Sequence, residues 1–254
     1  MKWTAVVLAG SRPGRDPFAR QFGTDLKPLI PVAGQPMVAR PVRALLDSAV
    51  IGKVIVLSQE PKRIAAVLPK NRRIKFAQSE ATISETIEEL ILDKATRFPI
   101  VVTTADHALL DTQMIAEFTS KAEGADLAIG MVERKSLLAR LPQSKRTWIA
   151  FRGGAYSGAN LFAFGSLKAL APIEQWRSVE QDRKKGWRVL SALGPVVLLG
   201  ALLRLRTLDQ IVAAVGRRLG VNARAVLLSN PLAAVDVDKP IDHAVVETIL
   251  AGKA

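Results

Sequence analysis

Residues 3–10 read WTAVVLAG: a short apolar run, Trp3 to Leu8, leads into a glycine. Two similar runs follow, KVIVL at 53–57 and PIVVT at 99–103. Continuous apolar runs rich in β-branched residues are typical of parallel strands that are covered on both faces. The segment 3–10 therefore predicts the first strand of a parallel sheet, followed by a glycine-bearing loop.

Helical patterns separate these runs. Apolar residues recur at helical spacing over 36–46, 82–92 and 112–122, the last with Asp111 in the position of an N-terminal cap. Alternating strands and helices predict an α/β sandwich with right-handed crossovers. Beyond residue 125 the pattern predicts strands over 125–132, 148–151, 160–164 and 226–228, and helices within 166–220 and over 240–250. We find no internal repeat or linker and expect one composite domain over 1–254.

The composition excludes several classes of protein. Of the 254 residues, 49% are apolar, which excludes a disordered protein. The absence of cysteine excludes a disulfide scaffold, thiolate zinc sites and a cysteine nucleophile, and two histidines are too few for a multi-histidine metal site. The first residues lack a signal-peptide pattern and no run reaches the roughly 18 apolar residues of a membrane span, so we expect a cytoplasmic protein.

The charge predicts an anionic partner. Lys and Arg number 36 against 23 Asp and Glu, which gives a formal net charge of +13. This balance favours nucleic acid, a phosphorylated substrate or an acidic membrane face, with a plain solvated surface as the alternative. The basic residues lack interleaved aromatic residues and belong to no recognisable nucleic-acid module, so we expect no specific nucleic-acid binding.

The loop after the first strand has residues suited to phosphate. Gly10 and Gly14 allow the backbone to approach a phosphate closely, and Arg12, Arg15 and Lys27 would neutralise a polyphosphate. In open α/β sheets, ligands bind at the carboxyl edge of the strands, where this loop begins. The P-loop pattern and the dinucleotide pattern G-x-G-x-x-G are both absent, so a plain glycine turn is the alternative.

Two sequence blocks together resemble a known signature. The first is Leu8-Ala9-Gly10 followed by Arg12 and Arg15, and the second begins at Lys27 and carries Leu29, Val32, Gly34, Pro36 and Met37. The pair resembles the signature of the GT-A-like nucleotidyltransferases, the MobA-like NTP transferase superfamily. The segment 11–25 is longer than usual in that family and contains Pro13 and Pro17, so the choice between the two arginines for the conventional position stays open.

The resemblance implies a fold and a set of roles. The fold would be a three-layer α/β/α sandwich with a mostly parallel, Rossmann-like sheet of the GT-A type. Residues 1–125 would form the nucleotide-binding half, and 126–254 the acceptor-binding half with a C-terminal metal-ligand segment. The nucleotide phosphates would lie against Leu8, Ala9, Gly10, Ser11 and Gly14. Lys27, with Arg12 or Arg15, would hold the triphosphate and stabilise charge at the α-phosphorus.

Two acidic segments resemble the family's metal ligands. Asp106 follows the strand 99–103, where the family has a metal-binding aspartate, and a carboxylate there suits Mg²⁺ beside a triphosphate. The segment VDVDKPID at 235–242 resembles the family's second metal segment, with Asp238 as first choice and Asp236 as second. Helix capping is the alternative, and Asp242 would favour the positive N-terminus of the last helix. The resemblance implies Mg²⁺ as the cofactor.

Substrate-binding segments are also implied by the resemblance. Base or ribose recognition would fall on Gln78, Ser79 and Ser84, although a helix cap formed by Thr82 and Glu85 explains that segment equally well. The base is undetermined: CTP or another NTP.

The acceptor would meet Gly158 and Asn160, in a stretch similar to the family's G-x-N-[LIV], for which a plain turn into a strand is the alternative. The segment 187–206 is apolar with flanking arginines. It reads either as a core helix or as a surface that meets an anionic membrane face or a lipid-precursor acceptor. The acceptor would be a phosphorylated small molecule or a lipid precursor, and the second interpretation adds a peripheral contact with an anionic membrane.

The predicted reaction is Mg²⁺-dependent transfer of a nucleotidyl group from an NTP to a phosphorylated acceptor, with release of pyrophosphate. One rival is a GT-A glycosyltransferase that uses a nucleotide-sugar. Its usual D-x-D motif near the middle of the sequence is absent, because Asp106-His107-Ala108 stands there. The other rival is a non-catalytic nucleotide-binding module, against which Lys27, Asp106 and Asp238 argue. The oligomeric state is not predicted.

Overall fold

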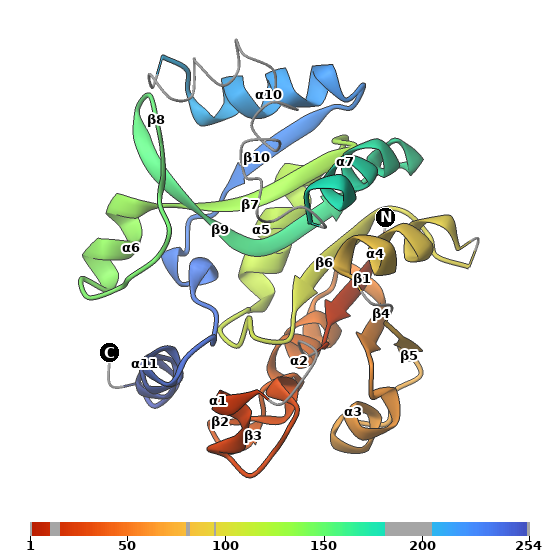
Figure 1. Cartoon of the computed structure of the whole chain (residues 1–254), viewed down its shortest axis with the longest axis vertical. Coiled ribbons are helices and arrows are strands. Elements are labelled where there is room, and N and C mark those ends of the chain that lie inside the picture. Colours follow the sequence, from red (N-terminus) through yellow and green to blue (C-terminus); the bar gives the residue numbers. More distant parts are fainter. Residues whose placement is uncertain (1, 11–15, 80–81, 94, 181–204, 253–254) are drawn as a thin grey trace.

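Strand β1 (Trp3–Leu8) lies inside the main sheet of the computed structural model, which describes residues 2–10, 16–79, 82–93, 95–180 and 205–252. It pairs in parallel with β4 (Ile51–Ser58) on one side and with β6 (Ile100–Thr104) on the other. The strand order is β10-β7-β9-β6-β1-β4-β5, and β8 pairs with β9 outside this path (Figure 1). The three runs that the sequence indicated as strands are therefore neighbours at the centre of the sheet.

The first half of the chain follows the predicted alternation of strands and helices. Its helices and edge strand are α2 (Ala39–Asp47), α3 (Pro61–Val67), β5 (Ile74–Gln78), α4 (Ile83–Leu92) and α5 (Thr112–Ala122). The long connection after β1 holds only short elements: α1 (Pro17–Arg20), η1 (Lys27–Leu29), β2 (Pro31–Val32) and β3 (Gln35–Pro36). Strand β5 gave no clear signal in the sequence because it lies at the sheet edge, and four of its five residues are exposed.

The second half contributes the antiparallel part of the sheet. Its elements are β7 (Leu127–Glu133), α6 (Arg134–Arg140), β8 (Ile149–Phe151), β9 (Gly154–Phe164), η2 (Leu167–Ala169), α7 (Leu170–Glu180), α10 (Leu208–Arg218), β10 (Ala223–Leu227), η4 (Pro231–Ala234) and α11 (Pro240–Leu250). Strand β9 is antiparallel to both β6 and β7. It begins six residues before the predicted strand 160–164, because its first six residues, GAYSGA, do not form an apolar run.

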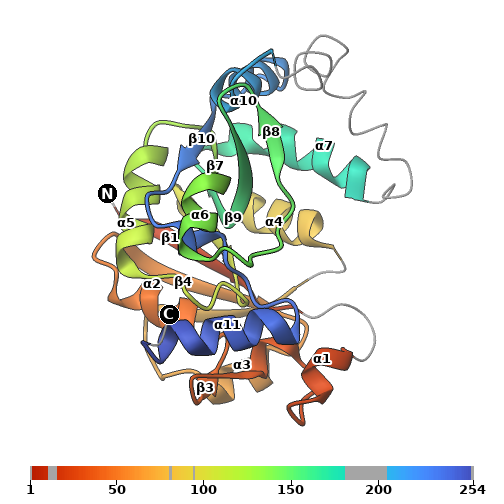
Figure 2. The same ribbon diagram turned by 90° about the vertical axis from the view of Figure 1, so that its left-hand side faces the viewer.

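Helices cover both faces of the sheet. Within β1, Ala5 and Val7 belong to one apolar core and Val6 to the other, since successive side chains of a strand point to opposite faces. Helices α2, α3 and α5 contribute to the first core, whereas α4 and α7 contribute to the second (Figure 2). The predicted three-layer α/β/α sandwich with a mostly parallel sheet is confirmed.

No helix within the described ranges is long and apolar enough to cross a membrane. Of the apolar and basic segment 187–206, only Leu205 and Arg206 fall among the described residues. Both interpretations of that segment, the core helix and the surface that meets an anionic membrane, stay predictions.

Candidate active site

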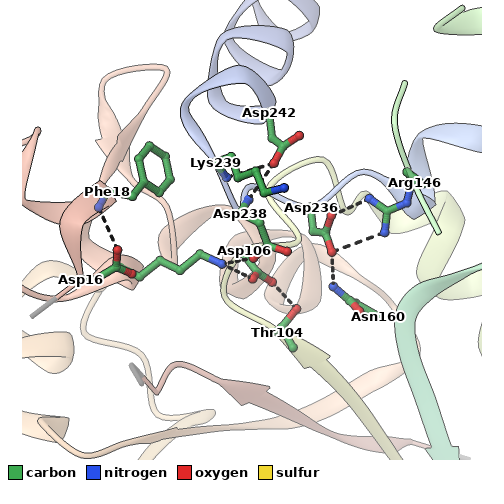
Figure 3. A network of polar contacts seen from close by, with 11 residues as sticks. Asp16, Phe18, Thr104, Asp106, Arg146, Asn160, Asp236, Asp238, Lys239 and Asp242 are labelled. Carbon is green, nitrogen blue, oxygen red and sulfur yellow. Dashed lines mark hydrogen bonds and ion pairs between the residues drawn. The ribbon is translucent and has the colours of Figure 1, made fainter. Parts of the chain in front are cut away.

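A lysine and two aspartates from three distant parts of the sequence meet at the carboxyl edge of β6. The ammonium nitrogen of Lys27 lies 2.6 Å from Oδ2 of Asp106 and also forms an ion pair with Asp238. Lys27 precedes these partners by 79 and 211 positions. Figure 3 shows the carboxylates of Asp106 and Asp238 turned toward each other. Three of the predicted site residues therefore share one location.

Local structure fixes each member of this cluster. Lys27 is the first residue of η1, where Pro28 supports the tight 3₁₀ turn. Asp106 lies in the turn after β6, and the hydroxyl of Thr104 donates to its Oδ1 at 2.5 Å. The main-chain N–H of Val237 donates to the carbonyl of Asp106 at 3.0 Å and brings the segment before α11 to the same turn. The following Asp238 is thereby placed beside Asp106.

The pKa values of Lys27 and Asp106 depend on the charged groups beside them. Burial acts to lower the pKa of Lys27, but the attraction and hydrogen bonds of Asp106 and Asp238 outweigh it and hold this pKa above its ordinary value. Burial raises the pKa of Asp106, and Lys27 offsets this only in part. The lysine is thus a stable cation at neutral pH. A further cation beside Asp106 would favour its ionised form.

Asp236, the second choice for a metal ligand, has different partners. The Arg146 guanidinium binds its carboxylate in a two-point contact, with Nη1 to Oδ1 at 2.5 Å and Nη2 to Oδ2 at 3.4 Å. The side-chain amide of Asn160 donates to Oδ2 of Asp236 at 3.1 Å. The sequence analysis missed Arg146, because its loop before β8 carries no motif and its partner lies 90 positions away.

The described part of the first loop ends at Gly10. A Cβ at Gly10 would lie 3.0 Å from the side-chain amide of Gln59, so the loop passes close to the end of β4. The carbonyl of Leu8 accepts from the N–H of Ala105 at 2.9 Å, and the N–H of Ala9 donates to the carbonyl of Leu57 at 2.8 Å. Four predicted residues lie outside the described ranges: Ser11, Arg12, Gly14 and Arg15.

The segment predicted to bind the base follows edge strand β5. Gln78 is exposed, and its amide donates to the carbonyl of Gln59 at 3.2 Å. The Ser79 hydroxyl is buried and has no hydrogen-bond partner among the described residues. Ser84 is buried and its hydroxyl lies 3.2 Å from that of Thr82. Thr82 itself accepts from the N–H of Glu85 at 3.2 Å, so the alternative interpretation as a helix cap is correct for this threonine.

The predicted acceptor residues lie on β9. Gly158 is exposed, and apart from its chain neighbours no described residue has an atom within 4 Å of the position where a Cβ would stand. Asn160 has a positive φ of 47°, a conformation that asparagine tolerates better than most residues. The structure places Asn160 against Asp236, and so brings the predicted acceptor strand next to the C-terminal acidic segment.

His107, to which the sequence assigned no chemistry, is buried immediately after Asp106. Burial lowers the pKa of His107 to about 4, so the ring is neutral at physiological pH. Its Nδ1 lies 3.1 Å from the hydroxyl of Thr103 inside the core of the sheet. The ring therefore packs, and it takes no part in the charged cluster.

The fold and the position of the cluster define a Rossmann-like α/β protein whose candidate site lies at the carboxyl edge of a mostly parallel sheet. A family model for the MobA-like NTP transferase domain matches residues 5–196. The chain belongs to this family, and the resemblance drawn from its sequence blocks is confirmed. A comparison with curated proteins finds no match.

Solved structures share the fold over nearly the whole chain. A hypothetical transferase from Thermus thermophilus is 29% identical, with 96% of this chain and 100% of that chain covered and a TM-score of 0.81. The 4-diphosphocytidyl-2C-methyl-D-erythritol synthase of Anaerococcus prevotii is 11% identical, with coverage of 98% and 96% and a TM-score of 0.63. The CMP:2-keto-3-deoxy-manno-octonic acid synthetase, complexed with CTP, is 13% identical, with both chains fully covered at 100% and a TM-score of 0.61. The last two show likeness of fold alone.

Proposed function

We propose that this protein transfers a nucleotidyl group from an NTP to a phosphorylated acceptor at the cluster of Lys27, Asp106 and Asp238. The observation that carries the proposal is the convergence of one ammonium and two carboxylates at the carboxyl edge of β6. Membership of the MobA-like NTP transferase domain family supports it independently. With Mg²⁺ on the two carboxylates, the lysine and the metal together would hold a triphosphate.

The reaction requires positioning and charge neutralisation. An oxygen of the acceptor phosphate would attack the α-phosphorus of the NTP and form a new P–O bond. The bond from that phosphorus to the bridging oxygen would break, and pyrophosphate would leave with the electron pair. The attacking oxygen is already ionised at neutral pH, so no general base is needed. In-line alignment and fixed cations supply the rate enhancement.

Lys27 is one cation that this protein would contribute, together with Arg12 or Arg15. Its ammonium pairs with Asp106 and Asp238, and its raised pKa keeps it charged. Beside a triphosphate it would donate to phosphate oxygens and stabilise the charge that develops at the α-phosphorus. Its place on η1, next to a rigid proline, limits the motion of its backbone.

The carboxylates of Asp106 and Asp238 suit Mg²⁺. Magnesium prefers hard oxygen ligands and in nucleotide sites takes one or two carboxylates together with phosphate oxygens and water. When bound there it would neutralise phosphate charge and orient the triphosphate. Asp236 fits this role less well, since Arg146 and Asn160 occupy its oxygens.

The test is pyrophosphate release with each of the four NTPs, Mg²⁺ and a panel of phosphomonoesters. CTP is the first nucleotide to try, because the structure of the octonic acid synthetase is a complex with CTP. We expect Lys27→Ala to lower the rate by about 100-fold or more. The matched control is Lys121→Ala, which breaks a lysine–carboxylate pair with Glu117 elsewhere. Equal rates in the two variants would refute the proposal, and release of a nucleoside diphosphate from a nucleotide-sugar would indicate the glycosyltransferase alternative.

A further inference from the structure

A second charged group lies beside the first, on the side of strand β9. It consists of Arg146, Asp236, Asn160 and Ser157, which we call the Arg146 network. Figure 3 shows Asp236 between Asp238 on one side and Arg146 with Asn160 on the other. Val237, fully buried, separates the two aspartates along the backbone, and its N–H is bonded to the carbonyl of Asp106. The two groups are thus held on one short, anchored segment.

The network fixes the guanidinium of Arg146. Its two Nη atoms bind the two oxygens of Asp236, and its Nε donates to the hydroxyl of Ser157 at 3.3 Å. The side chains of Arg146 and Asp236 are only 18% and 17% exposed. A guanidinium has five N–H bonds in a fixed plane, of which these contacts use three. The other two, one on each Nη, have no partner among the residues that the structure describes.

The position of Asn160 depends on an irregularity of β9. Between β7 and β9 the pairing moves from Ile129 with Phe162 to Met131 with Gly158. Over this step β9 advances by four residues and β7 by two, which makes a bulge in β9. Such a bulge re-aims side chains out of the regular pattern. The bulge lies over Gly130, where a Cβ would be 3.0 Å from Cβ of Leu161. Asn160 lies within this bulge, and its side-chain amide contacts Asp236.

The N–H donors of Arg146 that have no partner among the described residues can bind an anion at this network. The acceptor phosphate must approach a triphosphate that is itself strongly negative, so it needs a cation of its own. Lys27 is already shared by Asp106 and Asp238. Arg146 and Asn160 of β9, the strand predicted to meet the acceptor, bind the same carboxylate, and the guanidinium held there keeps one N–H on each Nη for a phosphate oxygen.

We propose that Arg146 binds the phosphate of the acceptor, and that Asp236 is a positioning residue for Arg146 and no metal ligand. The proposal rests on the proposed function and names the group by which this protein recognises its acceptor. Asp236 keeps the guanidinium in one orientation, and Asn160 keeps Asp236 in place. The acceptor class is a phosphomonoester whose phosphate carries the attacking oxygen.

The first experiment measures binding without turnover. Inorganic phosphate is titrated into the wild-type protein, Arg146→Gln and Lys145→Gln, and its dissociation constant is followed by calorimetry. Lys145 is the neighbouring exposed residue of the same loop, so its variant loses the same charge. We expect binding to weaken by at least about 10-fold in Arg146→Gln and to stay unchanged in Lys145→Gln. Absence of phosphate binding to the wild type, or equal constants in both variants, would overturn the proposal.

Arg146→Gln leaves Asp236 without its counter-ion and could fail to fold. The double variant Arg146→Gln with Asp236→Asn removes both charges, so that no half-buried ion is left without a partner. It should fold like the wild type by circular dichroism and still lose the phosphate affinity. Retained affinity in this folded variant contradicts the role of Arg146. The titration needs no NTP. It therefore tests phosphate binding by Arg146 even if no NTP releases pyrophosphate and the proposed function fails.

The second experiment tests Asp236 by its kinetic signature. Asp236→Asn should raise KM for the acceptor by about 10-fold while KM for the NTP and the Mg²⁺ concentration for half-maximal rate stay constant. Asp238→Asn should instead shift the Mg²⁺ dependence. If Asp236→Asn shifts the Mg²⁺ dependence as strongly as Asp238→Asn does, Asp236 is a metal ligand and the assignment is wrong.

Discussion

The N–H of Val237 donates to the carbonyl of Asp106 at 3.0 Å, which joins the turn after β6 to the segment before α11. The bond brings the backbone of residue 238 next to the turn that carries Asp106. Lys27 then completes the cluster from a third segment. The backbone contact therefore holds the two aspartates together, so that their carboxylates can serve a ligand.

Replacing either proposed metal ligand should alter the Mg²⁺ requirement. We expect Asp106→Asn and Asp238→Asn each to raise the Mg²⁺ concentration for half-maximal rate by at least about 10-fold, since each removes one anionic oxygen ligand. The measurement is initial rate of pyrophosphate release against Mg²⁺ concentration. Asp25→Asn is the control, because Asp25 pairs with Arg63 on the surface. A Mg²⁺ curve for Asp106→Asn that matches the control would contradict the assignment.

Glycine at position 130 should be needed for the bulge of β9. In Gly130→Ala the new methyl group would meet Leu161, whose Cβ and carbonyl oxygen lie 3.0 and 3.3 Å from it. We expect a loss of about 1–3 kcal/mol in the free energy of unfolding, as for other overpacked sites. Denaturant unfolding measures it. Gly158→Ala is the matched control on β9, since its methyl group would meet nothing within 4 Å and should change stability little.

Glu117 of α5 should stabilise the fold only while it is ionised. Its Oε1 accepts from the hydroxyl of Ser229 at 2.6 Å and from Lys121 at 2.6 Å. Burial acts to raise the pKa of Glu117, but the hydrogen bonds of Lys121 and Ser229 outweigh it and hold this pKa below its ordinary value of 4.5. The stabilisation is therefore complete above pH 4.5 and is lost as the pH falls through the lower pKa of the folded state.

The corresponding experiment compares Glu117→Gln with the wild type across pH. We expect the variant to be less stable by about 1 kcal/mol at pH 7, and the difference to disappear as the pH falls below the lowered pKa of Glu117 in the folded state. Thermal unfolding at a series of pH values measures it. Glu123→Gln at the exposed end of the same helix controls for the change in net charge. A difference that persists unchanged into acid would show that the carboxylate charge is irrelevant.

The N-terminal cap of α5 should contribute measurably to stability. The carboxylate of Asp111 accepts from the N–H of Met114 at 2.7 Å. We expect Asp111→Ala to lower the free energy of unfolding by about 0.5–2 kcal/mol, because a helix donor loses its partner. Asp47→Ala, at the last residue of α2, serves as the control and should not destabilise. Equal melting temperatures of the wild type and Asp111→Ala would contradict the prediction.

Much of the sheet and its helices could be read from the sequence because their signals are local. The apolar run Trp3 to Leu8 is buried on both faces, so every residue had to be apolar or small, and the pattern was unambiguous. Asp111 caps α5 by accepting from an N–H three residues further on, within reach of a short motif. Strand β5 and the first part of β9 lacked such a signal, because one lies exposed at an edge and the other, GAYSGA, forms no apolar run.

Local patterns were enough to specify the fold class, the family, and Lys27, Asp106 and Asp238 as candidates, since each stands within a recognisable stretch of sequence. The folded arrangement was needed to show that Asp238 joins Lys27 while Asp236 joins Arg146. The two aspartates are two residues apart in similar surroundings of sequence, and their partners lie 211 and 90 positions away. Contacts over such separations follow from the packing of strands and loops, which local spacing does not encode.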